Sequence, residues 1–154
     1  MYTLSIYTPN AELRALYQER KNFSTDAGVD LYIPHEVCID GYQTALVDLE
    51  IKCKLEDAAG VEHGYLLYSR SSIVKTPLLL ANGVGVVDIG YRNTVKAALR
   101  NVAFDGSNAS YTIAKHSRLV QIVAADMKPI TVKIVEEDFE TTSRGLGGFG
   151  STGV

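Results

Sequence analysis

The feature that most limits the fold of this chain is its division into many short apolar runs, separated by turn residues. The runs are rich in Val, Ile, Thr, Tyr and Leu, which favour strands. Many short strands at close spacing predict an all-β barrel or sandwich. The expected strands are residues 2–7, 29–33, 44–55, 64–68, 78–81, 84–87, 94–100, 111–114, 119–125 and 131–135.

Two segments depart from the strand pattern. Residues 11–20 are good helix formers, and Asn10 could cap them. A short helical turn could also follow Arg70, with Ser71 and Ser72 as candidate caps.

Length and composition exclude several classes of protein. The 154 residues are enough for one domain, and a net charge of -3 argues against a nucleic-acid binder. Cys38 and Cys53 form no metal motif, and we expect both to be buried, as in a reducing compartment. No apolar run reaches membrane-spanning length, and the start of the chain lacks a signal peptide. These features predict a soluble protein of the cytoplasm or nucleus that contacts neither nucleic acid nor membrane.

The glycine-rich stretch from residue 141 carries possible chemistry. Gly145, Gly147 and Gly150 fit GxGxxG, but no following helix is expected, as a dinucleotide site would need. Glycine N–H groups beside a guanidinium and hydroxyls suit a phosphate chain, and Phe149 could stack on a base. A disordered tail is the alternative that composition alone favours.

Four further segments contain candidate polar residues. Residues 82–93 (NGVGVVDIGYRN) predict a hairpin, after which Asp88 would be partly sheltered. Residues 69–72 (SRSS) suit phosphate, 27–32 (AGVDLY) lead into a strand, and 117–123 (SRLVQIV) place Gln121 among apolar residues. Each segment alone is as compatible with a turn or a core role as with a site.

Together and in this order, the five segments closely resemble the five motifs of the trimeric dUTPase family. The resemblance runs from residue 27 to 153. It implies a distorted antiparallel jelly-roll-like barrel with little helix over residues 1–140. It also implies a homotrimer with shared active sites, in which a mobile arm, residues 141–154, closes a neighbouring subunit's site. Residues 11–20 would then be a connection rather than a helix of consequence.

The implied activity is hydrolysis of dUTP to dUMP and pyrophosphate, which keeps uracil out of DNA and supplies dUMP for thymidylate synthesis. Asp88 matches the aspartate that activates the water attacking the α-phosphorus. Tyr91 matches the residue that packs on the sugar, and Asp30 the one that reaches Mg²⁺ through water. The remaining implied substrate contacts are, for uracil, Asn82, Gly83, Gly85, Val86, Val87 and Phe149, and, for the phosphates, Arg70, Ser71, Ser72, Gln121, Arg144, Gly150, Ser151 and Thr152.

The chain departs from the family pattern at three places. Asn93 replaces a glycine, which is mild because asparagine tolerates a left-handed backbone. His116 and Ser117 replace a glycine and an acidic residue, and Ser69 replaces a frequent proline. A dCTP deaminase of the same fold, a nucleotide-gated regulatory module and a purely structural jelly roll are the alternatives. The complete motif set argues against each of them.

Overall fold

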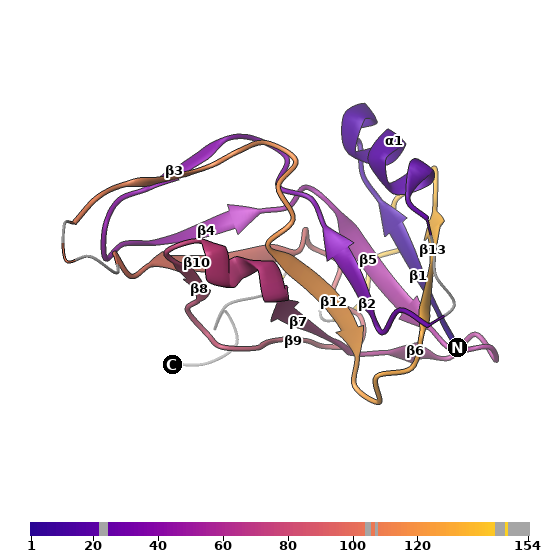
Figure 1. Ribbon diagram of the computed structural model, residues 1–154. Helices are drawn as coiled ribbons and strands as arrows, with labels where there is room; N and C mark the ends of the chain where they lie inside the picture. The colour runs from indigo at the N-terminus through magenta and orange to yellow at the C-terminus, as the bar shows by residue number, and fades with distance from the viewer. Residues whose placement is uncertain (22–24, 104–105, 107, 144–146, 148–154) are drawn as a thin grey trace.

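The computed structural model describes residues 1–21, 25–103, 106, 108–143 and 147, and their regular secondary structure consists mainly of strands (Figure 1). Hydrogen bonding divides the strands among four sheets, with orders β13-β1-β5-β6, β4-β10-β8, β11-β3 and β2-β12-β7-β9. The all-β prediction is confirmed. The strands are β1 (Tyr2–Tyr7), β2 (Gly28–Leu31), β3 (Val37–Ile39), β4 (Thr44–Asp48), β5 (Lys52–Glu56), β6 (Glu62–His63), β7 (Tyr65–Ser69), β8 (Leu78–Leu80), β9 (Gly85–Val87), β10 (Lys96–Asn101), β11 (Tyr111–Ile113), β12 (Val120–Ala124) and β13 (Ile130–Ile134).

One pairing differs from the expected antiparallel architecture. β1 runs parallel to β13, with Tyr2 opposite Ile130, whereas the other described pairs are antiparallel. A parallel pair needs a long crossover rather than a tight turn. Here nearly the whole chain forms that crossover.

The β2-β12-β7-β9 sheet separates apolar from polar side chains by strand alternation. Val29, Leu67 and Ile122 lie in register and are buried. Asp30 and Gln121 pair on the opposite face and are only partly covered. Successive residues of a strand point to opposite faces, so the pattern that fills the core also aligns these two polar groups.

The run expected as one strand from 44 to 55 is two strands in different sheets. Glu50 has a φ of 55°, and its N–H bonds to the Asp48 carboxylate at 2.8 Å. This left-handed kink lets the chain leave β4 and continue as β5 beside β1. Leu49 and Ile51 on either side of the kink are fully buried. The residues on both sides of the kink therefore belong to the core, while Glu50 itself is partly exposed.

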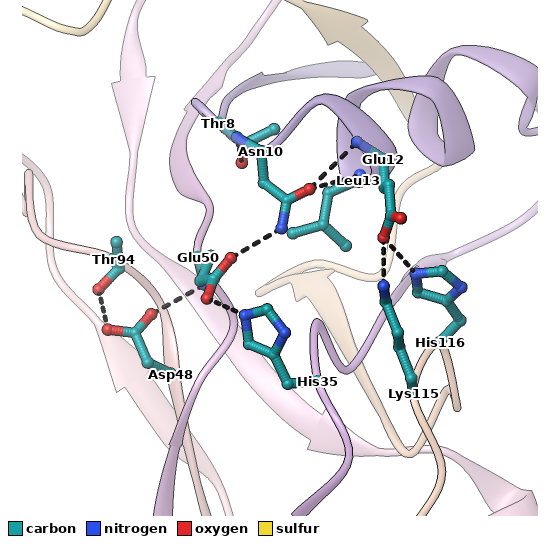
Figure 2. Close-up of polar contacts among 10 residues, drawn as sticks. All are labelled: Thr8, Asn10, Glu12, Leu13, His35, Asp48, Glu50, Thr94, Lys115 and His116. Carbon is teal, nitrogen blue, oxygen red and sulfur yellow. Dashed lines mark hydrogen bonds and ion pairs between the residues drawn. The ribbon is translucent and has the colours of Figure 1, made fainter.

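The helix over residues 11–20 is confirmed, and its dismissal as a mere connection is wrong. Helix α1 (Ala11–Glu19) is capped by Asn10, whose Oδ1 accepts the N–H groups of Glu12 and Leu13 at 3.1 and 3.3 Å (Figure 2). Leu13 and Tyr17 are buried in the core. The Tyr17 hydroxyl accepts the N–H of Tyr32 just after β2, so α1 braces the strand that carries Asp30.

Two further expectations need correction. Strands β3 and β6, of three and two residues, were not among the expected strands. Cys38 is exposed rather than buried: β3 and β11 pair with Cys38 opposite the exposed Thr112, while Ile39 and Ile113 face inward. Cys53 is buried as expected, and both thiols are free. Among the described helices, none is long and apolar enough to cross a membrane.

Candidate functional site

An ion-paired cluster gathers polar residues from three of the predicted motifs. The Asp30 carboxylate accepts Arg70 Nε at 2.6 Å through one oxygen and Arg118 Nη1 at 3.2 Å through the other. Arg70 Nη1 also donates to the Arg118 carbonyl at 2.9 Å and to Ser72 Oγ at 3.2 Å. These contacts fix the plane of the Arg70 guanidinium, which suits recognition of a phosphate.

Gln121 shares a hollow with this cluster. Its Nε2 donates to the Ser69 carbonyl at 3.2 Å. A hollow of about 410 Å³ is lined by Asp30, Arg70 and Gln121 together with Arg20, Asp26, Ala27 and Gly28. A Cβ on Gly28 would lie 2.1 Å from Gln121 Oε1. The glycine of the first motif is therefore what leaves room for the glutamine of the fourth.

The serines after Arg70 begin a short 3₁₀ helix, η1 (Ser71–Lys75), so the predicted helical turn is confirmed. Its cap position is Arg70, with no side-chain capping bond, so the expected capping by Ser71 or Ser72 is wrong. Ser72 instead accepts from Arg70, and Ser71 is exposed.

Residues 81–84 form a turn that leads from β8 to β9 in a different sheet, and the predicted hairpin is wrong. Gly83 has a φ of 69° and donates to the Leu80 carbonyl, so it ends a turn over residues 80–83 instead of sharing the centre of a hairpin turn with Asn82. However, β8 pairs with β10 while β9 pairs with β7. A Cβ on Gly85 would lie 3.1 Å from the Cβ of Leu67. That glycine therefore permits close approach of β9 to β7.

Asp88 follows β9 at the edge of the sheet and is exposed in the single chain, not partly sheltered as expected. It lines a hollow of about 610 Å³ with His63, Gly64, Tyr65, Leu66, Val86, Val87, Ile89 and Ala125. Val86 and Ile89 beside it are 72% and 59% exposed. Tyr91 is half-buried, and its hydroxyl donates to the Thr94 carbonyl at 2.9 Å.

The ion-paired cluster and Asp88 lie at opposite ends of β7. Val87 pairs with Tyr65, and the α-carbon of Asp88 lies beside Gly64. Arg70 follows the last residue of β7, six residues further along. At about 3.3 Å per strand residue, the separation along the strand is about 20 Å. The described residues of one chain thus hold two half-sites rather than one assembled site.

A buried ion pair next to Asp88 was not foreseen from the sequence. Arg92, 8% exposed, donates through two nitrogens to the two oxygens of Glu62, each at 2.9 Å. Hydrogen bonds from Arg92 lower the pKa of the Glu62 carboxyl, and those same bonds raise the pKa of Arg92. Glu62 belongs to none of the five motifs. The one signal in the sequence that could have revealed the pair is the presence of two opposite charges among apolar residues.

Two of the three motif departures, at His116 and at Asn93, have different structural outcomes. His116 has a φ of 65° at the place of the usual glycine, and its ring lies 3.6 Å from the Glu12 carboxylate, which also pairs with Lys115 (Figure 2). Asn93 does not use the left-handed backbone that we expected it to tolerate. Its Oδ1 accepts the N–H of Thr94.

Several predicted residues cannot be compared with the structure. Within the described ranges, no group of three or more potential metal ligands is present. The implied contacts that lie outside the described residues are Arg144, Phe149, Gly150, Ser151 and Thr152.

Comparisons with known proteins agree with each other. The dUTPase family model matches residues 19–153. A deoxyuridine 5'-triphosphate nucleotidohydrolase of Alkaliphilus metalliredigens is 35% identical over 132 residues, covering 84% of each chain. The Staphylococcus bacteriophage 80alpha dUTPase G164S mutant with dUpNHpp superposes with a TM-score of 0.64 at 25% identity, covering 98% of both chains. A second 80alpha structure, with a TM-score of 0.63, 25% identity and the same coverage, is described under phage dUTPases that control transfer of virulence genes by a proto-oncogenic G protein-like mechanism.

Proposed function

This chain belongs to the dUTPase family, and we propose that its two half-sites are the triphosphate-binding and water-activating parts of one dUTP-hydrolysing site. The reaction is hydrolysis of dUTP to dUMP and pyrophosphate. The observation that carries the assignment is the grouping of Asp30 and Gln121 on one sheet with Arg70 at the end of its strand β7, while Asp88 directly follows the edge strand β9 of the same sheet.

Asp88 acts as the general base in this proposal. Water attacks the α-phosphorus as Asp88 accepts a proton from it. A bond forms from the water oxygen to the α-phosphorus, and the bond from that phosphorus to the bridging oxygen breaks, so pyrophosphate leaves. Support comes from the position of Asp88 beside a hollow that is open to a ligand.

Arg70, Ser71, Ser72 and Gln121 bind the triphosphate. Asp30 and the Arg118 carbonyl hold the Arg70 guanidinium in place before any nucleotide arrives. A positive charge that is already in position where negative charge develops on the phosphates stabilises the transition state without any rearrangement of the protein during the reaction. Arg144, Gly150, Ser151 and Thr152 would complete the phosphate contacts from the arm.

The turn from β8 to β9 reads the base. Asn82, Gly83, Gly85, Val86 and Val87 offer backbone groups to the edge of uracil, and Phe149 stacks on its face. A buried site built on hydrogen bonds rejects a mismatched base more strongly than shape alone. Tyr91 packs on the sugar and excludes a 2′-hydroxyl. Its half-buried ring and its bond to the Thr94 carbonyl hold it beside Asp88.

Magnesium is the proposed cofactor, held chiefly by the phosphates and by water. The residues fit this role, because both Asp30 oxygens already accept bonds from arginines and retain lone pairs for a metal-bound water. When bound, Mg²⁺ neutralises charge that develops on the phosphates.

A homotrimer is the proposed assembly. Asp88 and Arg70 of one chain are about 20 Å apart along β7, so a complete site would take Asp88 from one subunit and Arg70 from another. Exposed Val86 and Ile89 beside Asp88 offer apolar surface for such contacts. Residues 141–154 would reach across as the arm that closes a neighbouring site.

A regulatory role is the second candidate. The likeness to the 80alpha enzyme, described among dUTPases that control gene transfer, extends over 98% of both chains. A partner captured only when dUTP is present would support such a role in addition to catalysis.

Pyrophosphate release from dUTP, dTTP, dCTP and UTP, with Mg²⁺ and with chelator, tests the proposal. We expect fast, Mg²⁺-dependent release from dUTP alone. Asp88→Asn should lose turnover while binding dUTP. Lost binding would make Asp88 structural, and ammonia release from dCTP would indicate the deaminase instead.

A further inference from the structure

Gly90, in the turn that follows Asp88, has both of its backbone polar groups held by distant residues. Its N–H donates to Glu62 Oε1 at 2.8 Å. Its carbonyl accepts the Thr142 hydroxyl at 2.5 Å. Gly90 is buried, and the Tyr91 N–H donates back to the Asp88 carbonyl at 3.2 Å to close the turn. The backbone next to Asp88 is therefore fixed from two directions.

Glu62 is itself rigidly held. Arg92 donates two hydrogen bonds to the Glu62 carboxylate in a bidentate pair. Arg92 Nε also donates to the Glu140 carbonyl at 3.2 Å. The Arg92 guanidinium also lies 5.8 Å from the Phe139 ring centre. A forked, little-exposed pair restricts both partners more than a surface ion pair does. Arg92 thus joins Glu62 to the segment that leads into the arm.

The fit around Gly90 is tight, and its backbone conformation disfavours a side chain. Its φ is 79°, and an added Cβ would lie 3.3 Å from Thr142 Oγ1. We call residues 139–142 the arm root, because they contain the first residues of the predicted arm. Thr142 of the arm root therefore contacts Gly90 directly, in the turn that follows Asp88.

We propose that Thr142 and Glu62 are positioning residues that set the orientation of Asp88 and link it to the arm root. This rests on the proposed role of Asp88 as general base. Thr142 holds the Gly90 carbonyl and Glu62 holds the Gly90 N–H, so the two residues together fix the backbone of the turn that follows Asp88.

The test compares Thr142→Val with Thr141→Val in the full-length protein. Thr142→Val keeps the shape and removes the hydroxyl, whereas the neighbouring Thr141 is exposed. We expect Thr142→Val to lower kcat by about 10- to 100-fold, since small misplacement of a catalytic group costs this much. KM for dUTP and the melting temperature should stay close to wild type. Thr142→Ser should restore kcat, and Thr141→Val should match wild type.

A second arm of the experiment uses Glu62→Gln. Glu56→Gln is its control, because Glu56 lies opposite Glu62 in the β5–β6 pair and forms an ion pair with Lys54. Glu62→Gln should lower kcat, and Glu56→Gln should not. The Glu62→Gln/Thr142→Val double variant should lose less than the product of the two single losses, because both act through Gly90.

Normal kcat in Thr142→Val, measured beside an inactive Asp88→Asn, would overturn the link. So would a loss of kcat that accompanies a fall in melting temperature and is not restored by serine. A fully active Asp88→Asn would instead refute the assignment of the base, whatever the Thr142 variants do.

Discussion

Replacing Gly28 by alanine should separate activity from stability. The new Cβ would lie 2.1 Å from Gln121 Oε1 and 3.0 Å from its Cδ, so the glutamine side chain must swing away. Gln121 would then lose its bond to the Ser69 carbonyl, worth about 0.5–1.5 kcal/mol. Alanine in place of a strand glycine gains about 0.5–1 kcal/mol. The two contributions nearly cancel.

The effect on activity has no such compensation. If Gln121 bonds to a phosphate, that charged hydrogen bond is worth about 1.5–3 kcal/mol. At 1.36 kcal/mol per tenfold change, kcat/KM for dUTP should fall about 10- to 150-fold. The melting temperature should change by no more than about 4 °C, the shift that 1 kcal/mol produces in a domain of this size.

The assay is pyrophosphate release alongside thermal melting, with Gln121→Ala as the comparison. Gln121→Ala should show the same loss of kcat/KM. Adding Gly28→Ala to it should cost nothing more, since the side chain that clashes is gone. Wild-type activity in Gly28→Ala, or full additivity in the double variant, would refute the reasoning.

Three further results are expected. Asn10→Ala should lower stability by about 1 kcal/mol through loss of the α1 cap (Figure 2) while Asn10→Ser keeps most of it, which chemical denaturation would measure; equal losses would exclude capping as the cause. The Arg92 bonds lower the pKa of Glu62, so their stabilisation is complete above the ordinary glutamate pKa of about 4.3 and is lost as pH falls through the lowered value. Melting temperature should therefore depend less on pH below about 4.3 in Glu62→Gln, and parallel curves would contradict this. Deleting residues 144–154 should leave a folded protein with sharply reduced kcat/KM, and full activity would remove the arm from the mechanism.

Sequence reasoning identified the strand class because period-two burial is written into runs such as residues 28–31 and 96–101. The helix was also readable locally, since Asn10 precedes good helix formers and caps them. Expectations about which strands pair with each other failed where the paired strands are far apart in the sequence. The Asn-Gly turn was found, but not that β8 and β9 join different sheets. Residues 44–55 looked like one continuous strand, because nothing in the sequence indicates that Glu50 adopts a left-handed backbone conformation.

By itself the sequence determined the class of fold, the five motifs in their order and the chemical groups they carry, because all three depend on residue type and local spacing. Only the tertiary structure decided which groups meet. It brought Asp30 to Arg70 and Arg118 across three strands, put Asp88 at the far end of β7, and tied Gly90 to Glu62 and Thr142. Such contacts join residues far apart in the chain, and they follow from strand register and core packing, which no local pattern encodes.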